Sequence, residues 1–120
     1  MSVSFTKESE NLFVVSIEGV LTFDELKEIE NKFTAAIDRS RKIKGLILAE
    51  NFSGWAKEGD WGNLEFMLKN DPYIQKIAVV ANEEKKDDLL IFLGKGMRQA
   101  SVESFPAGEK QKALDWLQQD

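Results

Sequence analysis

Cysteine and histidine are both absent from this 120-residue sequence. Without cysteine there can be no disulfide framework and no thiol nucleophile, and without histidine there is no imidazole base and no histidine-ligated haem. The joint absence also excludes the usual Cys/His zinc sites. Most familiar catalytic centres are thereby eliminated. We therefore expect no enzyme activity, no catalytic residue, no metal site and no cofactor.

Long apolar runs are missing as well. Runs such as 46–49 and 77–81 are far below the roughly 20 residues that a membrane span needs. The first seven residues alternate polar and apolar side chains and lack the basic start and apolar stretch of a signal peptide. These features predict a cytoplasmic protein with no integral membrane association.

Basic residues are in the minority, with 16 against 21 acidic residues and a net charge of −5. The field of such a molecule repels phosphate backbones, so we expect no nucleic-acid partner. Hydrophobic residues make up 42% and charged residues 31% of the chain, as in ordinary globular proteins. At this length we expect one domain with one core, spanning residues 1–120.

The first third of the chain predicts two strands and a helix. Residues 2–6 alternate in polarity and 12–17 are nearly all apolar, which predicts an edge strand paired with a more buried one across a turn at 7–11. Thr22 and Glu25 then have capping-box spacing. The helix that follows repeats apolar residues along one face, at Phe23, Leu26, Ile29, Phe33 and Ile37.

The remainder alternates strands with helices. Runs at 45–49 and 77–81 predict central strands covered on both faces. Between them, from about Asp60, apolar spacing predicts a short helix with Trp61, Leu64, Met67 and Leu68. Asn82 can cap a third helix that ends at 94–96 and whose inward-facing residues are Leu89, Leu90 and Leu93. A short edge strand at 100–103 follows and is closed by Pro106. The final helix, at 109–118, has one apolar face, with Ala113, Leu114 and Leu117.

The predicted order is β-β-α-β-α-β-α-β-α. Strands and helices that alternate after an initial hairpin indicate an α/β fold with a mixed, largely parallel sheet flanked by helices and joined by right-handed crossovers.

Several stretches resemble the SpoIIAA-like family of small STAS-like domains. The resemblance is carried by 51–55 (Asn-Phe-Ser-Gly-Trp), the strand 76–80, Phe105 and 113–117 (Ala-Leu-Asp-Trp-Leu). It implies a mixed sheet flanked by helices, an architecture shared by anti-sigma-factor antagonists and, more distantly, by CRAL-TRIO lipid-binding domains. The resemblance is more specific for fold than for activity.

The resemblance also raises the question of a phosphorylation switch. STAS switches carry a serine in an Asp-Ser-small-Gly motif at the start of a helix, and Ser53 and Gly54 fall close to that place. Phe52 stands where the motif has Asp, and the bulky Trp55 stands where the family keeps small residues. We therefore predict that Ser53 is not a regulatory phosphosite of the STAS kind.

The segment 50–61 is the candidate site, because it follows a central parallel strand at the edge where open α/β sheets bind ligands. We expect its aromatic and polar residues to form a ligand- or partner-binding surface, and two interpretations stay open. The aromatic rings either line an apolar pocket with a polar rim or form a small core that holds a long loop on the sheet. The acids could also hold a hard cation such as Mg²⁺, but their spacing is unspecific and solvated loop acids are the commoner case. The candidate residues are Glu50, Phe52, Ser53, Gly54, Trp55, Glu58, Asp60 and Trp61.

Two functional hypotheses follow. The first is a non-enzymatic interaction or regulatory module that docks a protein partner, a second copy of the chain included, through this segment. The alternative is a carrier or sensor of a small apolar molecule or lipid, enclosed near Phe52, Trp55 and Trp61. An exposed Trp55 would favour docking, whereas a buried cavity would favour the carrier.

Overall fold

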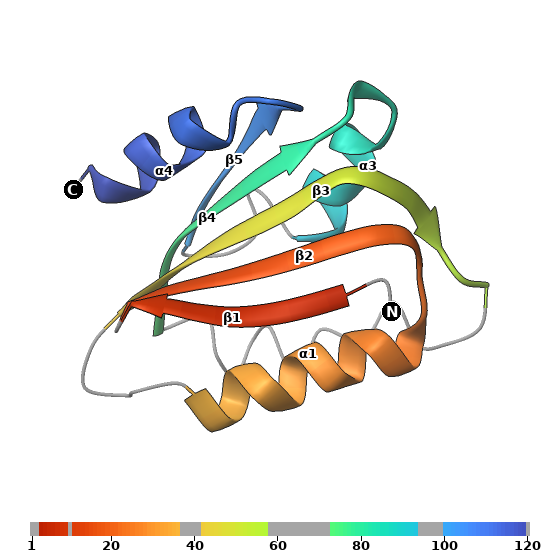
Figure 1. The fold of residues 1–120 in the computed structure, drawn as a ribbon, viewed down its shortest axis with the longest axis horizontal. Helices are drawn as coiled ribbons and strands as arrows, with labels where there is room; N and C mark the ends of the chain where they lie inside the picture. Colours follow the sequence, from red (N-terminus) through yellow and green to blue (C-terminus); the bar gives the residue numbers. More distant parts are fainter. Residues whose placement is uncertain (1–2, 10, 37–41, 58–72, 94–99, 120) are drawn as a thin grey trace.

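A five-stranded sheet with helices on both faces forms the centre of the molecule (Figure 1). The computed structural model describes residues 3–9, 11–36, 42–57, 73–93 and 100–119. The predicted helix after Asp60 lies outside the described residues. The described strands are β1 (Val3–Ser9), β2 (Leu12–Leu21), β3 (Ile43–Trp55), β4 (Ile74–Ala81) and β5 (Ser101–Pro106), and the helices are α1 (Phe23–Ala36), α3 (Glu83–Phe92) and α4 (Lys110–Gln118).

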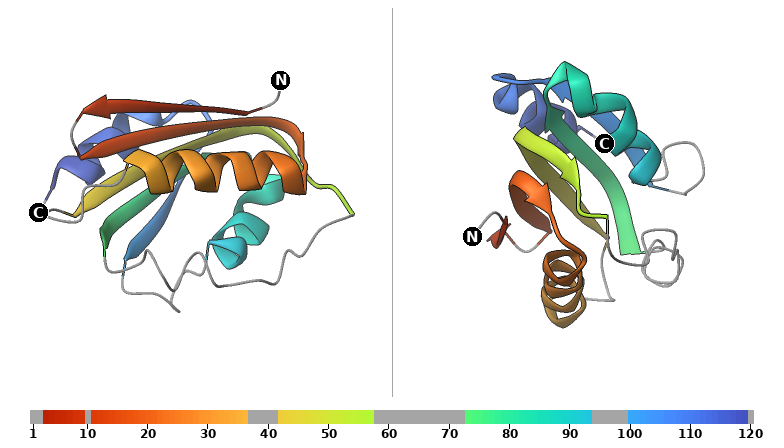
Figure 2. Two further views of the ribbon diagram at one scale, coloured as in Figure 1. Left: turned by 90° about the horizontal axis from the view of Figure 1, so that it is seen from below. Right: turned by 90° about the vertical axis from the view of Figure 1, so that its right-hand side faces the viewer.

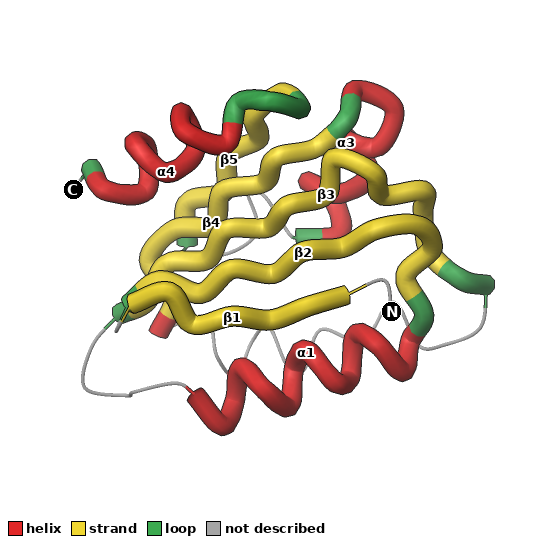
Figure 3. Tube along the Cα trace, viewed as in Figure 1, coloured by secondary structure: helices red, strands yellow, loops and turns green. Residues whose placement is uncertain are grey.

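The strands lie in the order β1-β2-β3-β4-β5 (Figure 3). β1 runs antiparallel to β2, whereas β2, β3, β4 and β5 run parallel to one another. The mixed, largely parallel α/β sheet predicted from the sequence is thus confirmed. The first hairpin is longer than predicted, because β1 continues to Ser9 and β2 starts at Leu12. Backbone pairing such as Lys7 with Phe13 extends the strands into the polar segment that we interpreted as a turn.

The two faces of the sheet carry separate cores. α1 and α3 cover one face and α4 covers the other (Figure 2). β4 contributes to both, since Val79 packs on the α1/α3 side while Ala78 and Val80 pack on the α4 side, and none of the three is exposed. This confirms 77–81 as a doubly covered central strand, and β3 is covered in the same way.

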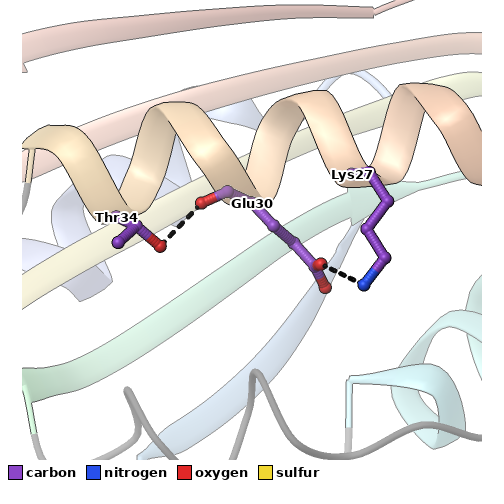
Figure 4. Close-up of polar contacts among 3 residues, drawn as sticks. All are labelled: Lys27, Glu30 and Thr34. Atoms are coloured by element: carbon purple, nitrogen blue, oxygen red, sulfur yellow. Dashed lines mark hydrogen bonds and ion pairs between the residues drawn. The ribbon is translucent and has the colours of Figure 1, made fainter.

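α1 begins at the predicted capping box. The backbone N–H of Thr22 donates to Glu25 Oε1 (2.9 Å), and the Glu25 N–H donates to Thr22 Oγ1 (3.2 Å). Local contacts link successive turns of the helix: Lys27 Nζ lies 3.3 Å from Glu30 Oε1, and Thr34 Oγ1 donates to the Glu30 carbonyl (Figure 4). The apolar face is only partly buried, with no fully buried residue in the helix, and Ile37 lies outside the described residues.

α4 is fixed to the sheet at its C-terminal end by a lysine. Lys76 Nζ, from β4, donates to the carbonyl of Trp116 (2.9 Å) and to that of Gln119, and it lies 4.8 Å from the centroid of the Trp116 ring. A cation at this position complements the negative end of the helix dipole. Ala113 and Leu117, predicted to face inward, are buried against β3 and β4.

No helix in the described part of the chain combines the length and the apolar character that crossing a membrane requires.

Candidate functional site

β3 continues well past the end of its neighbour β4. Their pairing ends at Ala49 and Ala81, whereas β3 stays paired with β2 as far as Trp55. The segment from Glu50 to Trp55, which we predicted to be a loop, is therefore strand. β2 explains the difference, because its backbone runs on to Leu21 and offers hydrogen-bond partners that a side-chain pattern does not reveal.

Two irregularities in this extension bring its apolar side chains to one face. The pairing with β2 advances by three residues on β3 between Leu48 and Asn51 while β2 advances by two, and a second extra residue falls between Phe52 and Gly54. Each extra residue is a bulge that shifts the side-chain alternation by one. Gly54 has φ of +130°, a conformation that side-chain-bearing residues rarely adopt.

As a consequence, every third side chain in this part of β3, instead of every second, points to the same face of the sheet. Ala49 and Phe52 are both buried in the core on the α1/α3 side, and Trp55 packs against the same core. A regular strand would turn alternate members of this series to opposite faces of the sheet.

Asn82 stands where β4 ends and holds the bulged strand. Its Nδ2 donates to the carbonyls of Glu50 (3.1 Å) and Phe52 (3.2 Å), and its Oδ1 accepts from the backbone N–H of Lys85 (3.0 Å). One side chain therefore caps α3, as predicted, and also hydrogen-bonds to carbonyls of β3 beyond the end of β4. The start of α3 and the end of β3 are thereby held in register.

Three aromatic rings from β3 and α3 pack in series. The Phe52 and Trp55 ring centroids are 4.9 Å apart in an edge-to-face arrangement, and the Trp55 and Phe92 centroids are 5.3 Å apart. Beside them lies an open hollow of about 370 Å³ whose described lining is Trp55, Asp88, Ile91 and Phe92. Ile91 is 77% exposed at this hollow.

Trp55 carries an unusual polar group. Its indole Nε1 is buried and has no hydrogen-bond acceptor among the described residues.

The predicted site residues separate in the structure. Phe52, Gly54 and Trp55 lie together at the end of β3, with Phe52 and Gly54 buried and Trp55 partly buried. Ser53 is exposed within the strand, not at the start of a helix. Glu50 makes its contact elsewhere, accepting a 2.6 Å hydrogen bond from the backbone N–H of Gly108 in the turn before α4. Three further predicted residues, Glu58, Asp60 and Trp61, lie outside the described residues.

Asp88, Ile91 and Phe92 were not among the predicted site residues. The sequence did hold a signal for Ile91, since Leu89, Leu90 and Leu93 were expected to face inward. Ile91 lies two residues after Leu89, on the other side of the helix, where an apolar side chain has no core to enter. Its proximity to Trp55 depends on the bulges in β3, which the sequence pattern does not reveal.

Replacing Glu50 with alanine is expected to lower the free energy of unfolding by about 1 kcal/mol, because the Gly108 N–H loses a charged acceptor. Chemical denaturation would measure the change. Ser53→Ala is the matched control, since that exposed neighbour has no hydrogen-bond partner among the described residues. Equal stability of the two variants would show that the Glu50 contact to Gly108 contributes nothing to the fold.

A sequence model of the SpoIIAA-like family matches residues 12–118 of the chain. The chain belongs to the SpoIIAA-like family. The match runs from the start of β2 to the end of α4 and so includes both cores and the bulged end of β3. No curated protein matches the sequence.

A solved structure resembles this SpoIIAA-like protein over nearly its whole length. It is the crystal structure of an uncharacterized protein with a SpoIIAA-like fold from Shewanella loihica PV-4. The likeness has a TM-score of 0.73 at 18% sequence identity and covers 96% of this chain and 91% of the other. At that identity the comparison shows that the two proteins share a fold, and it carries no information about activity.

Proposed function

We propose that this SpoIIAA-like protein is a non-enzymatic interaction module of the STAS-like kind. Its protein partner docks on the surface formed by Trp55, Asp88, Ile91 and Phe92, which we call the α3 surface. The observation that carries the proposal is the 77% exposure of Ile91 directly beside the aromatic rings of Trp55 and Phe92. Partner binding would cover this apolar side chain and stabilise the complex.

The local arrangement supports docking over a purely structural role. A single exposed apolar residue is ordinary on protein surfaces. Ile91, however, adjoins Trp55 and Phe92 in one hollow, and a hollow with aromatic walls is the kind of surface into which a partner inserts an anchor side chain. The extended β3 and the Asn82 contacts hold the two sides of the hollow in a fixed relation.

The absence of catalytic activity is proposed from composition. The chain has no histidine and no cysteine, so nucleophilic or acid–base chemistry would have to use carboxylates, hydroxyls or lysines. Among the described residues, no three acidic side chains come together as metal ligands would. Glu58 and Asp60, two of the acids considered for a cation, lie outside the described residues.

The alternative hypothesis of an apolar-molecule or lipid carrier gains no support from the comparisons. Phe52 and Trp55 pack against each other and against the core, and the hollow beside them is open to the surface. A carrier would be expected to bury most of its ligand. The open hollow therefore suits a docked side chain better than an enclosed ligand.

Ile91→Ser is expected to abolish partner binding without loss of stability, because the side chain is exposed and contributes little to the core. The tagged protein would be crosslinked in the cells that express it and purified with its bound proteins. Val20→Ser is the matched control, since Val20 is also β-branched and 51% exposed, but lies on β2.

Docking on the α3 surface would be supported if wild type and the Val20 variant recover the same stoichiometric partner and the Ile91 variant does not. Recovery of that partner with all three proteins would overturn the assignment of the surface. Thermal melts of the three proteins would show whether the folded fraction is the same.

A further inference from the structure

We infer that the α3 surface selects a protein segment in which a large apolar side chain is flanked by lysine or arginine. This inference rests on the proposed docking function and names the chemistry of the partner. The observation that supports it is the group of acidic residues that precede Ile91 on α3.

Three acids precede Ile91 on its own face of α3. Glu84, Asp87 and Asp88 precede it by seven, four and three residues, which places them on the same side of α3. All three are exposed, and Asp88 also lines the hollow. No described residue forms an ion pair with any of them.

The two lysines of α3 do not offset these charges. Lys86 pairs with Glu83, with Nζ and Oε2 3.9 Å apart, so its charge is matched by an acid other than these three. Lys85 reaches toward β3, where its Nζ lies 3.7 Å from the position that a Cβ on Gly54 would occupy. The apolar centre of the surface therefore has an acidic border.

Helix stability does not account for this border. Acids in the first turn, such as Glu83 and Glu84, interact favourably with the helix dipole. Asp87 and Asp88 lie beyond that turn, and aspartate is a poor residue for a helix interior. Like charges three or four residues apart, as Glu84 is from Asp87 and Asp88, destabilise a helix further. A basic partner would remove this repulsion and balance the exposed charge.

The same charges disfavour a second copy of the chain as the occupant. A symmetric dimer through the α3 surface would bring Asp87 and Asp88 of one copy against those of the other. Each copy carries a net charge of −5, which adds repulsion over a longer range. A basic apolar segment meets neither obstacle.

A random 12-residue peptide library displayed on phage, selected on the purified wild-type protein, is the probe. We expect the selected peptides to combine a large apolar residue with adjacent lysine or arginine. Their affinity should fall at least tenfold with Ile91→Ser. It should fall about tenfold with the double variant Asp87→Asn/Asp88→Asn and also when the salt concentration is raised.

The double variant Glu8→Gln/Glu18→Gln is the matched charge control. Glu8 and Glu18 are exposed on β1 and β2, so the net charge changes equally while the α3 surface is untouched. We expect it to bind the selected peptides as tightly as wild type. Equal weakening by both double variants would mean that overall charge alone drives binding and would overturn the inference.

Other outcomes separate the inference from the function on which it rests. The selected peptides could depend on Ile91 but lack basic residues and bind the Asp87→Asn/Asp88→Asn variant as tightly as wild type. That result would support the docking surface and reject the basic partner. Selected peptides that bind the Ile91 variant normally, or an empty selection, would count against both. A dimer of the wild-type chain in analytical ultracentrifugation that Ile91→Ser abolishes would show that a second copy is the occupant and overturn the inference.

Discussion

Leu46→Ala is expected to lower the free energy of unfolding by about 2 to 5 kcal/mol. Leu46 lies in the middle of β3 with no exposed surface and packs with Ala78, Val80 and Leu117 between the sheet and α4. Truncation removes its apolar contacts and leaves a cavity that the flanking strands cannot close without losing their pairing. Urea denaturation followed by circular dichroism would measure the loss.

Val20→Ala is the control for that experiment. This change also shortens a branched apolar side chain in the sheet, but Val20 is half-exposed. The free energy of unfolding should therefore change by no more than about 0.5 kcal/mol. If the Leu46 and Val20 variants lost the same amount, the core between the sheet and α4 would not be closely packed.

Changes at Asn82 are expected to have the second-largest effect. Asn82→Ala removes the α3 cap and leaves the carbonyls of Glu50 and Phe52 without their donor, for a loss of about 2 to 4 kcal/mol. Asn82→Asp keeps an acceptor for the Lys85 N–H but sets a carboxylate against those two carbonyl oxygens. We expect it to cost more than about 1 kcal/mol, although asparagine and aspartate are comparable helix caps.

Asn11→Asp is the matched control for the Asn82→Asp change. Asn11 is exposed and its Oδ1 accepts from Ser9 Oγ, a role that a carboxylate can keep. Thermal melts of the variants would measure the effects. An Asn82→Asp protein as stable as wild type would show that Asn82 acts only as a helix cap and does not hold the end of β3.

Much of the fold could be predicted because it depends on local patterns. The Thr22 and Glu25 capping box, the Asn82 cap and the inward Ala113 and Leu117 each follow from residue type and spacing over a few positions, and all appear in the structure. The buried run 77–81 was predicted as a central strand for the same reason. Such signals survive folding because local preference and tertiary packing agree.

The candidate site could be predicted only in part. Phe52 and Trp55 were expected to act together, and their rings do pack against each other. Their placement on a strand, and the different contact made by Glu50, were not foreseen. The strand placement depends on the backbone of β2, which pairs with this segment. The Glu50 contact depends on the turn before α4, which brings the Gly108 N–H within reach.

The sequence by itself determined the order of the described elements, the two central strands and the chemistry that the chain lacks, because these depend on composition and short-range periodicity. Only the tertiary structure decided that β3 would continue to Trp55 and that Ile91 would lie beside that ring. The reason is physical: bulges arise where one strand must match the backbone of another, and two segments far apart in sequence meet only when the sheet has formed.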